Sequence, residues 1–246
     1  MNRNHLKIIA CVSMLCDHVG YLLFPQAAWL RYVGRLAFPL FAFFIGEGCR
    51  YTRNRKKYCL GLLILSAVCQ LAYGAEELIT DGGLTATSSF WYFNVVFTFF
   101  FASLACFLLL DLRQCLRDRA FSAAAKKACL LALYLAALSA FCWFAWNRRR
   151  LHGWSLCLDY GMCGILLPMS AALFEDRRKK LFAFSLALLV YCFVFAASPL
   201  NVWFSLLCVP LLLCYNGQGG SRKLKYFFYV FYPAHLGLLY LISLFL

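Results

Sequence analysis

The feature that most constrains this chain is the recurrence of apolar runs about 20 residues long, the length at which a helix crosses the hydrocarbon core of a bilayer. The chain has 246 residues, of which 64% are hydrophobic and 14% are charged, and its mean hydropathy is +0.73. Soluble domains carry about a quarter charged residues. An aromatic content of 18% also argues against a disordered chain. The sequence therefore predicts a polytopic membrane protein.

Hydropathy predicts an all-α bundle of about nine transmembrane helices, which form a single domain over residues 1–246. The eighth segment is short, so we expect it to be tilted, broken or re-entrant. The connecting segments are brief, and none is long enough to fold as a separate soluble domain. The expected helices cover residues 6–24, 30–49, 58–74, 90–110, 128–146, 155–174, 181–197, 202–215 and 226–246.

The distribution of positive charge predicts the orientation of these helices, because cytoplasmic loops are enriched in Lys and Arg. With a cytoplasmic N-terminus, most of the 24 Lys and Arg residues fall inside, chiefly in 50–57, 113–127, 177–180 and 222–225. We therefore expect a multi-pass protein of the cell (plasma or inner) membrane, with its C-terminus outside. The net charge of +14 then reflects attraction to anionic lipids, and no nucleic-acid partner is expected.

One basic group, Arg148 to Arg150, falls on the outer side and has three open interpretations. It could anchor a helix end to lipid headgroups, contact an external anionic substrate, or signal an error in the number of spans. The 14 cysteines lie within or beside apolar segments and no pair has C-x-x-C spacing. We interpret them as packing residues and expect no metal site.

Ionisable and polar residues inside the expected spans are costly and are therefore candidate functional residues. Helical rise gives the depth of each one. Lys7 and Glu47 are expected at the inner mouth, beside the basic loop 50–57, and His235 near the middle of the membrane. The outer half is expected to hold Asp17, His18, Arg31, Arg35, Asn94 and Asp159.

Lys7 and His18 share one face of the first helix, since eleven positions make three turns plus about 20°. They are ~16 Å apart along the axis, which suits a ligand with an anionic end inside and a reactive end deep in the membrane. Histidine is the usual general base near neutral pH. Asp17 points ~100° away, so Asp159 or His235 could orient His18 from another helix. The alternative that these residues only stabilise the bundle stays open.

Three motifs carry a family resemblance: Asp17-His-Val-Gly20, Gly34-Arg-Leu-Ala-Phe-Pro-Leu-Phe41 and Phe231-Tyr-Pro-Ala-His-Leu236. In combination, the chain resembles the TraX family of integral membrane proteins. The resemblance spans the chain, is strongest over 6–58 and 225–240, and is weak between about 100 and 150.

The resemblance implies an activity, because the named member of the family is linked to N-terminal acetylation of conjugative pilin. The family is similar to the broader transmembrane acyltransferases, in which a basic residue, ten further residues and a catalytic histidine lie on an early helix. Lys7 and His18 match that spacing. The resemblance implies a transmembrane-acyltransferase-like fold and His18 as the catalytic histidine. It also implies that Lys7, Arg50 and Arg53 bind the phosphates of acyl-CoA.

The expected function is transfer of an acyl group, acetyl above all, from cytoplasmic acetyl-CoA to an amine or hydroxyl acceptor on the outer side. Acetyl-CoA is the expected co-substrate and membrane lipids are expected partners. The alternative is a small proton- or anion-coupled transporter, against which the lack of internal repeats argues. Asp17 and Asp159 are catalytic candidates beside His18; the substrate-binding candidates are Arg31, Arg35, Glu47, Asn94, Tyr160 and His235.

Overall fold

The computed structural model describes residues 1–80, 83–197, 201–220, 224–243 and 245. The chain divides into two compact units. The first combines Met1–Phe44 with Asp176–Leu246, and the second is Ile45–Glu175. Helix α3 (Ala37–Tyr51) begins in the first unit and ends in the second.

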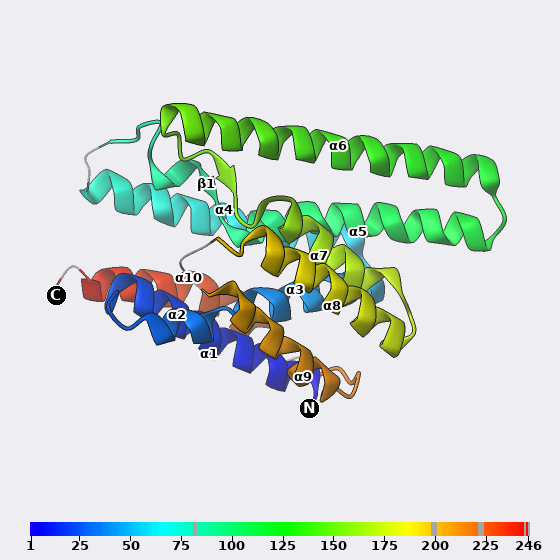
Figure 1. Cartoon of the computed structure of the whole chain (residues 1–246), viewed down its shortest axis with the longest axis horizontal. Helices are drawn as coiled ribbons and strands as arrows, with labels where there is room; N and C mark the ends of the chain where they lie inside the picture. Colours follow the sequence, from blue (N-terminus) through cyan, green and yellow to red (C-terminus); the bar gives the residue numbers. More distant parts are fainter. Residues whose placement is uncertain (81–82, 198–200, 221–223, 244, 246) are drawn as a thin grey trace. The chain divides into compact units, whose positions relative to one another are not determined.

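The first unit is built around helix α1 (Arg3–Leu22), which packs against α2 (Ala28–Gly34) and α10 (Leu224–Ser243) (Figure 1). Helix α8 (Arg177–Val194) packs against the 3₁₀ helix η2 (Val202–Leu207) and against α9 (Cys208–Leu213). Side chains cap three of these helices, with Asn201 accepting from the backbone N–H of Trp203 at the start of η2. Asn2 accepts from the backbone N–H of His5 at the start of α1, and Asp176 accepts from that of Lys179 in α8.

The second unit is centred on helix α5 (Val95–Arg117), which contacts α4 (Arg55–Thr80), α6 (Phe121–His152) and α7 (Gly161–Leu173). The 3₁₀ helix η1 (Ser89–Trp91) leads into strand β1 (Tyr92–Phe93). Strand β1 pairs in parallel with β2 (Cys157–Leu158), with Tyr92 opposite Cys157.

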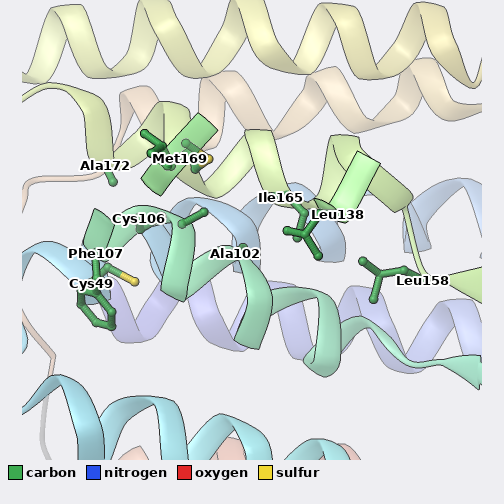
Figure 2. Packing of buried hydrophobic residues seen from close by; sticks show 11 residues of the cluster. Cys49, Ala102, Cys106, Phe107, Leu138, Leu158, Ile165, Met169 and Ala172 are labelled. Carbon is green, nitrogen blue, oxygen red and sulfur yellow. The ribbon is translucent and has the colours of Figure 1, made fainter. Parts of the chain in front are cut away.

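Small residues let the helices of the second unit approach closely, as they do in membrane bundles generally. Ala102 and Cys106 of α5 are fully buried against Ile165 and Met169 of α7 (Figure 2). Gly46 of α3 has no room for a Cβ atom, because the carbonyl of Pro168 in α7 occupies that position. The core of this unit is therefore apolar and tightly packed.

Four helical segments in the described part of the chain are long and apolar enough to cross a membrane: Ala28–Tyr51 (α2 and α3 together), Arg55–Ile79, Val95–Arg117 and Phe121–His152. Shorter apolar helices cover Gly161–Leu173, Val202–Leu213 and Phe227–Ser243. The chain is thus an all-helical integral membrane protein. The count of nine spans, the acyltransferase-like fold, the single-domain organisation and the orientation stay predictions. Helix α6 continues to His152, so Arg148 to Arg150 lie in its last turns.

The second expected helix, over 30–49, is interrupted at Arg35 and Leu36, where α2 ends and α3 begins. Pro39 has no N–H, so the Arg35 carbonyl lacks the backbone donor that residue 39 would otherwise supply in a helix. The hydroxyl of Ser205 donates to that carbonyl at 3.1 Å, and Ser13 donates to the Val33 carbonyl at 2.6 Å. A carbonyl freed inside a membrane needs another donor, which Ser205 supplies to Arg35, whereas the Val33 carbonyl also accepts from the N–H of Leu36.

The eighth expected segment is not one regular helix either, because η2 runs directly into the short helix α9. Of the basic group 222–225, Leu224 and Lys225 begin helix α10, whereas Arg222 and Lys223 lie outside the described residues.

Candidate active site

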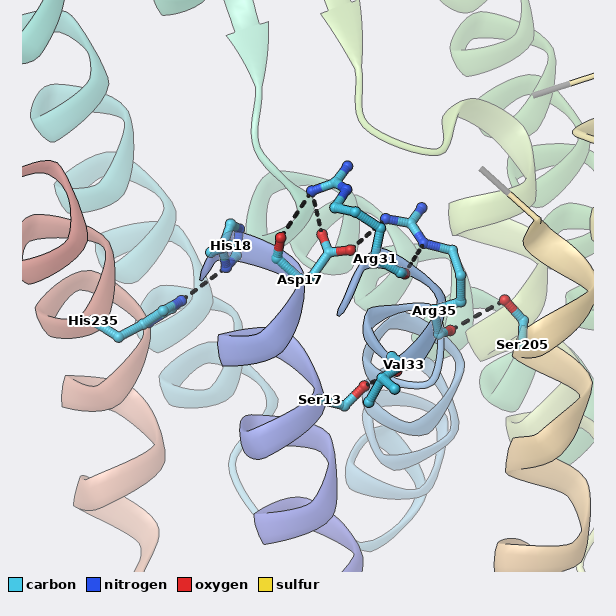
Figure 3. Close-up of polar contacts among 8 residues, drawn as sticks. All are labelled: Ser13, Asp17, His18, Arg31, Val33, Arg35, Ser205 and His235. Atoms are coloured by element: carbon cyan, nitrogen blue, oxygen red, sulfur yellow. Dashed lines mark hydrogen bonds and ion pairs between the residues drawn. The ribbon is translucent and has the colours of Figure 1, made fainter. Parts of the chain in front are cut away.

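The first unit brings two histidines together from distant parts of the sequence. His18 of α1 and His235 of α10 are joined by a 3.0 Å hydrogen bond between Nδ1 of His18 and Nε2 of His235 (Figure 3). Nδ1 of His235 lies 2.7 Å from the carbonyl oxygen of Phe231, one turn earlier on α10. The Phe231 ring also stacks on His235, with 4.9 Å between centroids. His235 is therefore fixed from two sides.

The hydrogen bonds determine which nitrogen of each neutral ring carries the proton. A carbonyl oxygen only accepts, so Nδ1 of His235 must be the N–H that donates to Phe231. Nε2 of neutral His235 then has a lone pair and accepts from Nδ1–H of His18. The lone pair of neutral His18 consequently lies on Nε2. His18 keeps some accessible surface, whereas His235 is 6% exposed.

Lys7 and His18 both face helix α10, in agreement with the prediction that they share one face of α1. The Lys7 ammonium lies 5.2 Å from the ring centroid of Phe228 and 6.0 Å from that of Phe44. Phe228 and His235 are seven positions apart on α10, which is about two turns. Helices α1 and α10 therefore run in the same direction along this face.

Asp17 does not share the histidine hydrogen bond but pairs with two arginines from the segment around α2. Nη1 of Arg31 donates to Oδ2 of Asp17 at 3.0 Å, and Nη2 of Arg35 donates to Oδ1 at 2.6 Å. The three side chains are between 11% and 18% exposed. Gly34 allows this approach, because a Cβ atom there would overlap Asp17.

The Asp17 group has one more positive than negative charge, and it lies beside His18 in the sequence. A fixed positive charge of this kind favours negative charge that develops on a substrate oxygen. Arg35 also donates through Nε to the Arg31 carbonyl at 3.2 Å, so its guanidinium is held in place. The expected outer cluster of Asp17, His18, Arg31 and Arg35 is thus gathered within the first unit.

Asn94, an expected substrate contact, lies in the second unit and is 2% exposed. Its side-chain oxygen accepts from the backbone N–H groups of Val96 and Phe97, which caps helix α5. Its side-chain nitrogen donates to the Ser66 carbonyl and to Oε1 of Gln70. These four bonds use all its polar atoms, so the structure gives Asn94 a role in helix capping.

Asp159 and Tyr160 also lie in the second unit, between β2 and α7. Oδ1 of Asp159 accepts from the hydroxyl of Tyr92 at 2.7 Å, and its carbonyl accepts from the hydroxyl of Thr98 at 2.7 Å. Tyr160 has a φ of +60°, a left-handed conformation that turns the chain into α7. Of the two candidates for orienting His18, His235 forms the hydrogen bond, whereas Asp159 belongs to the second unit.

The expected phosphate-binding residues are divided between the units, so their convergence stays a prediction. Lys7 belongs to the first unit, and Arg50 and Arg53 belong to the second. Arg50 donates to the Ala172 carbonyl and pairs with Glu175, whereas Arg53 is exposed in the turn between α3 and α4. Glu47 is buried on α3, with 4% exposure.

The sequence did not single out several residues that shape these sites. Phe231 fixes the tautomer of His235, and its position one turn earlier in the F-Y-P-x-H-L motif was a usable signal. Ser13 and Ser205 satisfy the interrupted helix but look like ordinary small residues in apolar segments. Arg113 and Glu175 look like members of solvated loops.

The fold and this polar cluster define a helical integral membrane protein with ionisable groups between its helices. A family model described as TraX protein matches residues 2–243. The chain therefore belongs to the TraX family, which confirms the resemblance seen in the sequence.

Two relatives extend the comparison. The chain is 30% identical over 260 aligned residues to the "Probable fimbrial assembly protein FimC, serogroup H1" of Dichelobacter nodosus, covering 98% of this chain and 95% of the relative. It is 44% identical over 41 residues to "Uncharacterized protein RP591" of Rickettsia prowazekii (strain Madrid E), 17% of this chain and 16% of that relative. No solved structure matches the chain.

Proposed function

We propose that this protein is a membrane acyltransferase that moves an acetyl group from acetyl-CoA to an amine or hydroxyl acceptor. The observation that carries the proposal is the hydrogen bond between His18 and His235. It leaves the lone pair of neutral His18 on Nε2, the atom not used within the pair. A histidine oriented in this way is suited to act as a general base.

In the proposed reaction, His18 carries one proton from the acceptor to the leaving CoA thiolate. Nε2 of His18 removes a proton from the acceptor amine or hydroxyl, whose N or O atom attacks the thioester carbonyl carbon. The C–S bond then breaks, and the CoA thiolate takes the proton back from Nε2. While His18 is protonated, Nε2 of His235 still accepts from its Nδ1–H. Arg31 or Arg35 would stabilise the carbonyl oxygen as it becomes negative.

The proposed acceptor is a pilus subunit, with its N-terminal amine as the group acetylated. This is supported by membership of the TraX family and by the name of the Dichelobacter nodosus relative, a probable fimbrial assembly protein. Acetyl-CoA would enter from the cytoplasm at Lys7, and the acceptor would approach from the outer side of the inner membrane. The positive-inside distribution of Lys and Arg supports that orientation.

The test is a transfer assay with the purified full chain in proteoliposomes. Radiolabelled acetyl-CoA is supplied on one side, and a peptide with the N-terminal sequence of a pilus subunit on the other. Labelled peptide, formed only with the peptide N-terminus free, is the expected result. Movement of intact acetyl-CoA or of another anion without any labelled product would overturn the proposal in favour of a transporter.

His235 is expected to act as a positioning residue, because its Nε2 accepts a hydrogen bond from Nδ1–H of His18. Replacing His235 with leucine removes that acceptor and should lower kcat by about 10–100-fold. His235→Gln should recover most of the rate, since its side-chain oxygen accepts a hydrogen bond at a similar reach. CoA binding should be unchanged in both variants. Equal losses in the leucine and glutamine variants, with an unaltered pH profile, would mean that His235 only fills space.

Lys7 is expected to bind a phosphate of CoA through a charge-assisted contact. Such contacts are worth roughly 1.5–3 kcal/mol, so Lys7→Ala should weaken CoA binding about tenfold or more. The measurement is a calorimetric titration of the protein in lipid nanodiscs, with the exposed Lys126→Ala as the matched control. Unchanged affinity in the Lys7 variant would remove this residue from the site.

A further inference from the structure

Three arginines of the second unit gather around one carboxylate. Nη1 of Arg50, at the end of α3, lies 2.9 Å from Oε1 of Glu175. Nη1 of Arg117, at the end of α5, lies 2.8 Å from the same oxygen. Arg113 is one turn before Arg117 and interacts electrostatically with all three groups. Its guanidinium carbon also lies 5.8 Å from the ring centroid of Phe174. We call these four charged residues the Arg50–Glu175 cluster.

The cluster has more positive charge than its carboxylate can balance. Neighbouring acids are engaged elsewhere. Asp111 pairs with Arg55 and Lys127, and Asp118 accepts from the side chain of Gln114. Hydrogen bonds from Arg117 and Arg50 lower the pKa of Glu175, which keeps it ionised. An excess positive charge therefore remains at this end of the second unit.

Two guanidinium nitrogens of the cluster are buried without an acceptor among the residues that the structure describes: Nε of Arg50 and Nη1 of Arg113. The Arg50 side chain is only 9% exposed, and its other two nitrogens are used by Glu175 and by the Ala172 carbonyl. A buried charged donor without a partner is costly. Two such donors on arginines that interact electrostatically with each other suggest a site for an anion.

We propose that the Arg50–Glu175 cluster binds a phosphate monoester, whose place Glu175 partly occupies in the absence of ligand. A carboxylate has two oxygens and one charge, and here a single oxygen serves two arginines. A phosphate monoester has three terminal oxygens and close to two charges, which matches three forked donors better. Glu175 is 58% exposed and lies in the connection between α7 and α8, so it can be displaced.

Two ligands present this chemistry to a membrane protein: the 3′-phosphate of coenzyme A and the headgroup of phosphatidic acid. The binding site does not depend on the proposed acyl transfer; only its assignment to coenzyme A does. The inference adds Arg113 and Arg117 to Arg50, the residue expected from the sequence to bind phosphate. Arg50, Arg113 and Arg117 come from segments that the charge distribution places on the cytoplasmic side.

The experiment measures binding to the full chain in phosphatidylcholine nanodiscs. Coenzyme A and dephospho-coenzyme A, which lacks the 3′-phosphate, are titrated by calorimetry. Retention of phosphatidic acid is measured by native mass spectrometry. Arg113→Gln should weaken binding of the phosphate monoester about tenfold or more, because it removes a charged donor. Lys126→Gln removes an exposed charge from α6 and should change affinity by less than about twofold.

Glu175→Gln gives the sharper result, because it removes the competing internal carboxylate and leaves the arginines in place. Its affinity for the phosphate monoester should rise several-fold, which a purely structural ion pair would not produce. If Arg113→Gln does not fold, the half-exposed Arg117→Gln gives the same expected loss.

The same variants show whether coenzyme A or phosphatidic acid supplies the phosphate. A preference of the wild type for coenzyme A over dephospho-coenzyme A, lost in Arg113→Gln, assigns the site to coenzyme A. If Arg113→Gln retains less phosphatidic acid but binds coenzyme A as the wild type does, the site is assigned to the lipid headgroup. Unchanged binding of both ligands in the arginine variants, with no gain in Glu175→Gln, would overturn the proposal. Failure of acetyl transfer with phosphate binding intact would count only against the proposed function.

Discussion

Replacing His18 by glutamine is expected to lower the rate of acetyl transfer by roughly 10²–10⁴-fold, the usual contribution of a general base. The amide can still form a hydrogen bond with His235, but it cannot take up the acceptor proton. Binding of coenzyme A should remain intact, because the contacts assigned to its phosphates lie elsewhere. The measurement is initial transfer of labelled acetyl by the purified variant, alongside a calorimetric titration with coenzyme A.

The matched control is Cys11→Ala, which alters a buried residue on the same face of α1. It should affect packing only and leave the transfer rate close to that of the wild type. A folded His18→Gln protein that retains most of the wild-type rate would show that His18 is structural. The base would then have to be His235 or Asp159.

Asp17→Asn is expected to reduce the free energy of unfolding by about 3–5 kcal/mol, because it removes the carboxylate that pairs with both Arg31 and Arg35 in a mostly buried position. The variant keeps the size of the side chain, so packing against Gly34 should change little. Unfolding of the detergent-solubilised protein in denaturant measures the difference.

The control for this change is Asp118→Asn, at the exposed end of α5, which should alter stability by no more than about 0.5 kcal/mol. The double variant Asp17→Asn with Arg35→Gln should regain part of the loss, since it removes one of the two positive charges that Asp17 balances. An effect of Asp17→Asn as small as that of the control would mean that the ion pairs contribute nothing to stability.

The sequence predicted the positions of the helices because hydropathy reports directly on membrane burial. It did not predict the interruption at Arg35 and Leu36. The cause is visible in the sequence as Gly34 and Pro39, but the hydroxyl donors from Ser13 and Ser205 at the break are not. Ser205 is 170 positions from Arg35, and no local pattern indicates that the two segments meet.

The candidate site shows the same division between local and long-range information. The shared face of Lys7 and His18 followed from helical periodicity within one segment. The choice of His235 over Asp159 as the partner of His18 required the pairing of α1 with α10. Asn94 looked like a functional polar residue in a span, but its local geometry explains it as the cap of α5.

The arginine cluster could not be recognised from the sequence, because its residues fall in charge-rich segments that normally face solvent. Arg113 and Arg117 are one turn apart on α5, which the sequence shows, whereas their proximity to Arg50 and Glu175 depends on how α3, α5 and α7 pack. Only Arg50, whose side chain is 9% exposed, stands out by burial, whereas Arg117 is about half exposed.

The measurement that tests the central claim most directly is calorimetric titration of acetyl-CoA into the wild-type protein in lipid nanodiscs. A membrane acyltransferase predicts saturable binding that persists in His18→Gln and weakens about tenfold or more in Lys7→Ala. The absence of any binding by folded wild-type protein would contradict the claim.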